Sequence, residues 1–257
     1  MFKKYLILIV VIFAIVLMCF FFEKNDQTIE TKTLIVGTSA DYKPFAFVDS
    51  KTNEFLGFDI DVAKELARRL DKQIIIKDIP FTSLIFALLS KDIDIIAAGM
   101  SPTEKRAETV LFSEQYIEPD PFMIVANPVI GEVSSIEDLI HKKVAVNTGH
   151  TAEAYMATKE GLGIDLIRLS SPADSMMALK SGAVDAFVCA TSVANDMLKQ
   201  DQSLQAYSKI MIPNTGDGCA LALHKNNDEL KKKVDQELRH MREDGTLKTL
   251  KEKWNLK

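Results

Sequence analysis

The stretch "DIDIIAAGMSPTEKRAETVLFSEQY", residues 92–116, decides the fold. Its first eight residues are mostly apolar and end on Gly99, which predicts a buried strand over residues 92–99. A turn with two hydroxyl side chains follows and passes through a short helical segment to Arg106, before a second apolar run begins. Because the turn leaves a strand and enters a helix, we expect it at the carboxyl edge of an α/β sheet, where ligands bind.

The residues before this stretch alternate between strand and helix patterns. Strands are predicted at residues 33–38 and 73–79, and helices from Asp59 to residue 70 and over residues 81–90. Asp59 places an acid at the positive end of the first helix. Strand, helix, strand, helix and strand in succession predict a parallel α/β sheet.

The same alternation restarts after residue 121 and predicts a second α/β lobe. Its strands are predicted at 122–128, 142–149, 165–170 and 184–190, and its helices at 135–140, 151–159, 171–182 and 191–200. A final strand at 219–224 precedes two amphipathic helices, 226–245 and 246–257, in which Leu230, Val234, Leu238 and Met241 share one face.

The final helices need a surface to cover, and a return of the chain to the first lobe would provide it. Two strands would then cross between the lobes, near 117–121 and 213–219, and form a hinge. We therefore expect an α/β protein with two sheets joined by a two-strand hinge. The predicted lobe 1 comprises residues 33–118 and 218–257, and the predicted lobe 2 comprises residues 119–217.

Composition narrows the function classes. A chain of 257 residues with 47% hydrophobic content can bury two cores, and its net charge of −5, with acids and bases interleaved, leaves no basic face for nucleic acid. The four histidines lack metal-ligand spacing, and no hydrolase, metalloprotease or nucleotide-binding motif is present. We expect no enzyme, cofactor or metal, and surface positions for His141, His224 and His240.

The N-terminus differs in kind from the rest of the chain. Lys3 and Lys4 precede an uncharged apolar run to residue 22, which predicts a signal or anchor segment over residues 1–22 and a polar tether over 23–32. Lipid modification of Cys19, an uncleaved membrane anchor and ordinary signal cleavage all stay open. Each places the lobes in the periplasm or at the outer face of the inner membrane.

Two cysteines remain beyond the N-terminal segment. Cys189 and Cys219 both lie in apolar runs, so they are either a disulfide pair formed in an oxidising compartment or core thiols.

The turn that contains Arg106 can bind an anion. Its N–H groups, the hydroxyls of Ser101 and Thr103, and the planar guanidinium can converge on one carboxylate. The alternative is that Arg106 pairs with Glu104 or Glu108 on a solvated turn.

A second turn of this kind occurs at residues 147–155, "NTGHTAEAY", in the other predicted lobe. Two such turns could clamp one carboxylate when the lobes close. Tyr42, Phe45 and Phe81 stand next to strand ends and offer aromatic walls, although core packing is the favoured role of Phe45.

Several blocks of the chain resemble the polar amino-acid-binding family of bacterial extracellular solute-binding proteins, family 3. In order they are GTSADYKPFAFVD, LGFDIDVAKELARRL, FTSLIFALLSKDIDIIAAGMSPTEKRAETVLFSEQY, VAVNTGHTAEAY, SGAVDAFV and EDGTLKTLKEKW. The resemblance covers nearly all of residues 33–257. It implies a two-lobed periplasmic-binding-protein fold of type II, which captures an amino acid between its lobes and delivers it to an ABC importer. The implied protein is a monomer whose partners are the importer permease and, through the N-terminal segment, the membrane.

The resemblance also implies site residues. Arg106, Ser101 and the Thr151 N–H would bind the ligand α-carboxylate. Tyr42 and Phe81 would sandwich the side chain, and the Gly99 carbonyl would face the α-ammonium. The remaining residues implied at the cleft are Met100, Thr103, Asn147, His150 and Ala190.

Ala190 departs from the family pattern, in which this position is usually an aspartate that holds the α-ammonium. Loss of such a charge-assisted hydrogen bond, worth roughly 1.5 to 3 kcal/mol, weakens binding by about ten- to a hundredfold unless another acid compensates. Asp41 and Asp217 are candidates by position only.

Other functions stay open at this point. A dehydratase-like enzyme on the same scaffold, a receptor for a carboxylate without an amine, and a receptor for a separate signalling protein or adhesin are the alternatives. Ser39 stands where receptors for basic amino acids often have an acid, which argues against lysine or arginine, but Asp41 two residues later weakens that argument.

Overall fold

The computed structural model describes residues 32–201, 203, 208–212, 214 and 216–256. The predicted signal or anchor segment 1–22 and the tether 23–32 lie outside the described residues, apart from Lys32. Within the described part of the chain, none of the helices combines the length and the apolar character needed to cross a membrane.

The first sheet has five strands and a single antiparallel member. Their order is β5 (Gln73–Asp78), β1 (Thr33–Thr38), β6 (Ile95–Ile96), β13 (Cys219–His224) and β7 (Val110–Ile117). β1 pairs in parallel with β5 and β6, whereas β13 is antiparallel to both of its neighbours.

The second sheet repeats this plan. Its order is β10 (Asp165–Leu169), β9 (Lys143–Asn147), β11 (Ala186–Ala190), β8 (Phe122–Ala126) and β12 (Ser208–Ile212). Here β8 is the antiparallel strand. A small third sheet consists of β2 (Asp41–Tyr42), β3 (Ala46–Val48) and β4 (Phe55–Leu56).

The predicted parallel pairing is confirmed for β1, β5 and β6, and the crossings between the sheets explain why one strand of each sheet runs antiparallel. The chain leaves the first sheet at the end of β7 and enters the second at the start of β8, where Phe122 pairs with Ala190 at the end of β11. On the return, Cys219 at the start of β13 pairs with Ile117 at the end of β7. A strand that arrives from the other sheet starts at the edge where the parallel strands end, so it must run antiparallel to them.

The predicted lobe boundaries fall in the two connections that pass between the sheets. Residues 118–121 separate β7 from β8, and residues 213–218 separate β12 from β13. The boundaries themselves stay a prediction.

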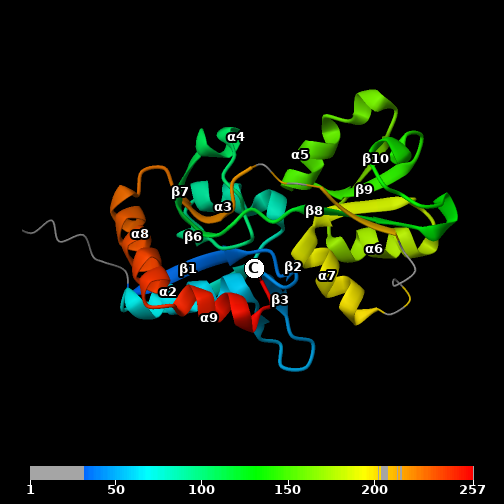
Figure 1. Cartoon of the computed structure of the whole chain (residues 1–257). Helices are drawn as coiled ribbons and strands as arrows, with labels where there is room; N and C mark the ends of the chain where they lie inside the picture. The colour runs from blue at the N-terminus through cyan, green and yellow to red at the C-terminus, as the bar shows by residue number, and fades with distance from the viewer. Residues whose placement is uncertain (1–31, 202, 204–207, 213, 215, 257) are drawn as a thin grey trace, which may run out of the picture. The chain divides into compact units, whose positions relative to one another are not determined.

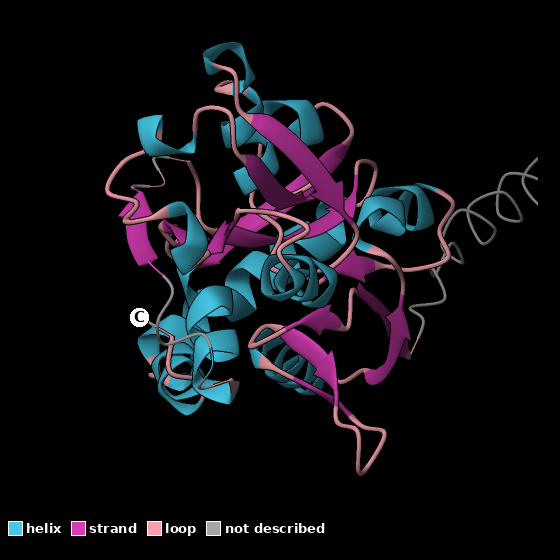
Figure 2. Ribbon diagram, turned by 90° about the vertical axis from the view of Figure 1, so that its right-hand side faces the viewer, coloured by secondary structure: helices cyan, strands magenta, loops and turns pink. Residues whose placement is uncertain are grey.

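Helices flank the strands of both sheets (Figures 1 and 2). Around the first sheet they are α2 (Phe58–Arg69), the 3-10 turn η1 (Phe81–Ser83), α3 (Leu84–Leu89), α4 (Glu104–Ala107), α8 (Asp228–Glu243) and α9 (Thr246–Lys253). Around the second they are η2 (Pro128–Ile130), η3 (Glu137–Leu139), α5 (Thr151–Ala157), η4 (Glu160–Leu162), α6 (Pro172–Ser181) and α7 (Thr191–Gln200).

Two predicted elements are shorter in the structure. The helix expected at 135–140 is only the turn η3, because Asp138 turns back to accept hydrogen bonds from the N–H groups of Ser134 and Ser135. The strand expected at 92–99 shrinks to β6, since the chain bends away after Ile96 into the turn at Gly99.

The C-terminal helices cover the first lobe, as their apolar face predicted. Val234, Leu238 and Met241 of α8 are fully buried, and Leu247 of α9 is nearly so. α8 packs on β7, α2 and α9, and Figure 1 places α8 and α9 beside α2 and β1.

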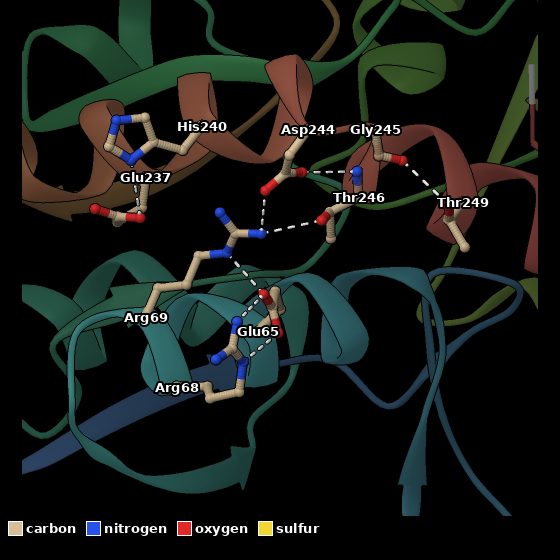
Figure 3. Close-up of polar contacts among 9 residues, drawn as sticks. All are labelled: Glu65, Arg68, Arg69, Glu237, His240, Asp244, Gly245, Thr246 and Thr249. Carbon is tan, nitrogen blue, oxygen red and sulfur yellow. Dashed lines mark hydrogen bonds and ion pairs between the residues drawn. The ribbon is translucent and has the colours of Figure 1, made fainter.

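Arg69 ties α2 to the junction between α8 and α9 (Figure 3). Its Nε donates to Glu65 at 2.7 Å, and its Nη2 donates to Asp244 at 2.6 Å and to the Thr246 hydroxyl at 3.0 Å. The Arg69 side chain is 14% exposed, whereas that of Arg68 is 69% exposed and bonds to Glu65 on its own helix.

We expect Arg69→Ala to lower the free energy of unfolding by about 1 kcal/mol, because it removes a link between segments far apart in sequence. Arg68→Ala is the matched control and should change stability less, since its ion pair is local and solvated. Chemical denaturation of both variants measures the difference. Equal losses would contradict the assigned role of Arg69.

Candidate functional site

Arg106 reaches from one lobe to the other. α4 begins after Thr103, whose hydroxyl oxygen accepts the Arg106 backbone N–H at 3.3 Å. The side chain donates from Nη1 to the Ser101 carbonyl at 2.6 Å and from Nη2 to the Gly149 carbonyl at 2.7 Å. Its guanidinium carbon also lies 5.4 Å from the centre of the Phe81 ring.

The charge of Arg106 has no acid partner among the described residues. The alternative that it pairs with Glu104 or Glu108 was wrong, since its hydrogen bonds go to backbone carbonyls instead. Burial lowers the pKa of the guanidinium, because removal from water disfavours its charged form. None of the described acids therefore neutralises the Arg106 charge through an ion pair.

His150 occupies the space between Tyr42 and Phe81. Its ring centre lies 4.8 Å from that of Tyr42 and 4.3 Å from that of Phe81, on which it stacks at 24°. Burial, together with the nearby positive charge of Arg106, lowers the pKa of His150 to about 4. The imidazole is therefore neutral near pH 7 and acts as an aromatic plate in the slot.

In the second predicted turn, at residues 147–155, a backbone N–H group is already hydrogen-bonded to the carboxylate of Glu153. The Gly149 N–H donates to Glu153 at 2.7 Å, and the Asn147 side chain donates to the Ser175 hydroxyl at 2.9 Å. Glu153 stands three residues after the N-cap His150, a position from which a glutamate reaches back to free N–H groups. This spacing was visible in the sequence, and the role of Glu153 was missed.

Gly149 also allows the two lobes to approach closely. Its φ is +81°, and a Cβ atom there would lie 3.4 Å from the Thr82 methyl and 3.6 Å from the Phe81 ring. A side chain at this position would be strained by the positive φ, and its Cβ would be in van der Waals contact with the opposite wall.

Two cavities flank the slot that His150 fills, and Phe81 and Thr82 line both of them. The first, of about 560 Å³, contains residues from both anion-binding turns: Met100, Thr103, Arg106, Gly149, His150 and Thr151. The second, of about 680 Å³, is lined in part by the hydroxyl residues Ser39, Thr148, Ser170 and Ser171, by the acids Asp41 and Asp78, and by the cation Arg168.

Asp59 fixes the turn at Gly99 from behind. Its carboxylate accepts the Gly99 N–H and, at 2.7 Å, the Tyr116 hydroxyl. Burial raises the pKa of Asp59 to about 7, and these two hydrogen bonds oppose that effect. The sequence predicted Asp59 only as an acid in the first turn of a helix.

Most residues of the predicted site come together. Those lining the first cavity are Phe81, Met100, Thr103, Arg106, His150 and Thr151. The Tyr42 ring contacts His150, and the Ser101 carbonyl accepts a hydrogen bond from Arg106. Gly99 lies against Tyr42, because a Cβ atom added to Gly99 would come within 3.4 Å of the Tyr42 ring. Asn147 is buried and engaged with Ser175, and Ala190 lines neither cavity.

Four other residues considered in the sequence line neither cavity: Phe45, Asp217, Cys189 and Cys219. Phe45 is 2% exposed, which confirms core packing, and Asp217 accepts a hydrogen bond from Gln115 at 3.0 Å. Cys189 and Cys219 are free thiols whose pKa values are raised by burial. Asp78 and Arg168, in the second cavity, carried no recognisable sequence signal.

The chain matches a family model over residues 34–257. That model describes the bacterial extracellular solute-binding proteins, family 3. Among curated proteins, the chain is 36% identical over 230 residues to the arginine-binding extracellular protein ArtP of Bacillus subtilis, covering 87% of this chain and 86% of that protein.

Solved structures show the same likeness. One is an ancestral arginine-binding protein bound to arginine, with a TM-score of 0.80, 35% identity and coverage of 87% of this chain and 98% of that one. Another is an ancestral amino acid-binding protein described as a precursor of cyclohexadienyl dehydratase, with a TM-score of 0.77, 34% identity and coverage of 87% and 95%.

The position of His150 predicts a pH dependence of stability. Its pKa is depressed in the closed, folded form, so the unfolded chain binds the extra proton first as the pH falls below about 6.5. The stabilisation is therefore present above pH 6.5 and is lost toward pH 4. Between pH 7.5 and pH 5 we expect the protein to lose about 2 kcal/mol more stability than His150→Gln.

Comparison with His150→Gln isolates this effect, because the opposite contribution of Asp59, whose pKa is raised, is common to both proteins. Chemical denaturation at the two pH values measures it. The same loss in both proteins would show that the imidazole is not enclosed.

Proposed function

The chain belongs to the bacterial extracellular solute-binding proteins of family 3, and on that premise we propose that its lobes close on an amino acid and deliver it to an ABC importer. The observation that carries the proposal is the Arg106 guanidinium, withdrawn from water and bonded to uncharged carbonyls of both lobes. A carboxylate entering the first cavity would supply the missing negative charge through two parallel hydrogen bonds.

The carboxylate-binding group would consist of Arg106, Ser101 and the Thr151 N–H. Thr151 is the first residue of α5 and lines the first cavity, so its N–H is one of those that a helix leaves without an internal partner. Because Arg106 and Ser101 come from one lobe and Thr151 from the other, a bound carboxylate would hold the lobes together.

The ligand side chain would pass between Tyr42 and Phe81. His150 fills this slot, so the ligand would have to displace the imidazole. Beyond the slot lies the second cavity, which carries the carboxylates of Asp41 and Asp78.

The charge of the second cavity favours a cationic side chain. Its cation, Arg168, is already paired with Glu153 at 2.7 Å and Glu160 at 3.1 Å. The Ser39 hydroxyl donates to Asp41 at 2.8 Å, so the acid that follows Ser39 by two residues in the sequence lies beside it in the second cavity. Together with the arginine-binding relatives, this leads us to propose arginine or a similar basic amino acid as the ligand.

We propose a binding protein and not an enzyme. A general acid works best with a pKa near the working pH. His150, the imidazole in the slot, has a pKa of about 4, and the Asp59 carboxylate is engaged by Gly99 and Tyr116. Neither residue therefore supports the dehydratase alternative.

The location of the protein follows from its class. A solute-binding protein of an ABC importer works outside the cytoplasmic membrane. We further propose that it acts as a monomer, docks on the importer permease, and is attached to the membrane by its N-terminal segment or by a lipid on Cys19.

Arg106→Ala should weaken binding of L-arginine at least a hundredfold in calorimetry, because a carboxylate then enters the cavity without a cation. The melting temperature of the ligand-free variant should stay nearly unchanged, since the removed charge had no acid partner. Arg68→Ala, on the surface of α2, is the matched control and should bind like the parent protein. A large fall in melting temperature with full binding would make Arg106 structural.

Asp41→Asn should weaken binding of L-arginine roughly two- to fivefold and leave binding of L-glutamine unchanged. Asp41 is exposed at the cavity, so its attraction for a cation is moderate. Titration of both amino acids into both proteins measures the selectivity. An equal change for the two ligands would rule out the second cavity as the cation site.

A further inference from the structure

An amino acid brings a cation to the site as well as a carboxylate, and its α-ammonium needs an anion. Glu153 acts on His150. Three other described acids act on groups of the site, namely Asp41 and Asp120 on Tyr42, and Asp59 and Asp120 on Cys219. Burial chiefly raises the pKa values of the Tyr42 phenol and the Cys219 thiol, and these acids raise them further.

Three of these four acids are engaged elsewhere. Glu153 pairs with Arg168 at 2.7 Å and accepts the Gly149 N–H. Asp59 uses both carboxylate oxygens, one for the Gly99 N–H and one for the Tyr116 hydroxyl. Asp41 is exposed at the second cavity and bonds to Ser39.

Asp120 keeps one oxygen free. Its Oδ2 accepts both donors of Ser192, the backbone N–H at 2.8 Å and the hydroxyl at 2.5 Å. No hydrogen bond to its Oδ1 and no ion pair occurs within the described part of the chain. Burial accordingly raises the pKa of the Asp120 carboxyl, which faces hydroxyl and amide donors but no cation.

The Asp120 carboxylate lies at the N-terminus of α7, where Ala190 has no polar side chain to contribute. Ala190 is the N-cap of α7 and has no side chain that could cap the helix. An N-cap side chain accepts a hydrogen bond from the second or third helical N–H, and Ser192 is the second residue of α7. Asp120 therefore places its carboxylate where an acid at position 190 would have placed one.

The backbone fixes this arrangement. Ala190 pairs with Phe122 across β11 and β8, and the Thr191 N–H donates to the Pro121 carbonyl at 2.8 Å. The Asp120 carbonyl accepts the side-chain amide of Asn214, from the second connection between the lobes, at 3.1 Å. Asp120 thus sits in the region where both connections meet α7.

Arg106 and Asp120 act on the same thiol. The positive charge of Arg106 opposes that of Asp120 at Cys219, and the Ser101 hydroxyl bonds to this thiol. A cation and an anion that form no ion pair with any described residue, both near one thiol, complement the two charged ends of an α-amino acid.

We propose that Asp120 determines specificity for α-amino acids by binding the ligand α-ammonium through its free carboxylate oxygen. The proposal rests on the proposed function and deepens it. Asp120 compensates for Ala190, and neither Asp41 nor Asp217 does so.

The test compares L-arginine with 5-guanidinopentanoic acid, which is arginine without its α-ammonium. The intact protein should bind L-arginine about ten- to a hundredfold more tightly than the deaminated acid. Asp120→Asn, whose amide oxygen can still cap α7, should lose this preference and bind the deaminated acid as before. Asp217→Asn is the matched control on the second connection and should keep the preference.

A rescue variant distinguishes the loss of the negative charge from a structural effect of the Asp120→Asn substitution. Adding Ala190→Asp to Asp120→Asn should restore the preference for L-arginine, because it returns a carboxylate to the N-terminus of α7. An undiminished preference in Asp120→Asn would overturn the assignment and leave the proposed function intact. No heat from any of the common amino acids would overturn the proposed function, and the assignment with it.

Discussion

The guanidinium of Arg106 is a charge largely withdrawn from water, no acid in the described part of the chain pairs with it, and the organisation of the site depends on it. Its hydrogen bonds go to the Ser101 carbonyl of one lobe and the Gly149 carbonyl of the other. Carbonyl dipoles satisfy the donors but leave the net charge, which burial makes costly. A site with such a residual charge favours an anion that arrives from solution, and that anion would strengthen the contact between the lobes.

The slot beside Arg106 is filled by the protein itself. The neutral imidazole of His150 lies between Tyr42 and Phe81, and protonation would bring a second positive charge beside Arg106. The ligand-free lobes therefore close through aromatic contacts and carbonyl hydrogen bonds, while a zwitterion would replace these with ionic ones. The difference between the two sets of contacts is the free energy available for binding.

Each group of residues that could be predicted lies within a single continuous segment of the chain. The turn from Gly99 to Arg106 is readable because a strand, a glycine, hydroxyl side chains and an arginine follow one another, and their roles depend on local backbone geometry. The buried face of α8 is readable for the same reason, since Val234, Leu238 and Met241 repeat at helical spacing. Glu153 could have been found in the same way, from its distance to the N-cap His150.

The sequence by itself determined the alternation of strands and helices and the turn from Gly99 to Arg106, because each depends on neighbours within a few residues, and its blocks along the chain determined the solute-binding class. Only the tertiary structure decided that β8 and β13 run antiparallel and that His150 stands in the slot. It alone also brought Asp120 to the N-terminus of α7, where the hydrogen-bonded residues are 72 positions apart in the chain. Such contacts join segments far apart in the chain, and they follow from its crossings between the two sheets and from the packing of the elements, which nothing in the sequence near either partner specifies.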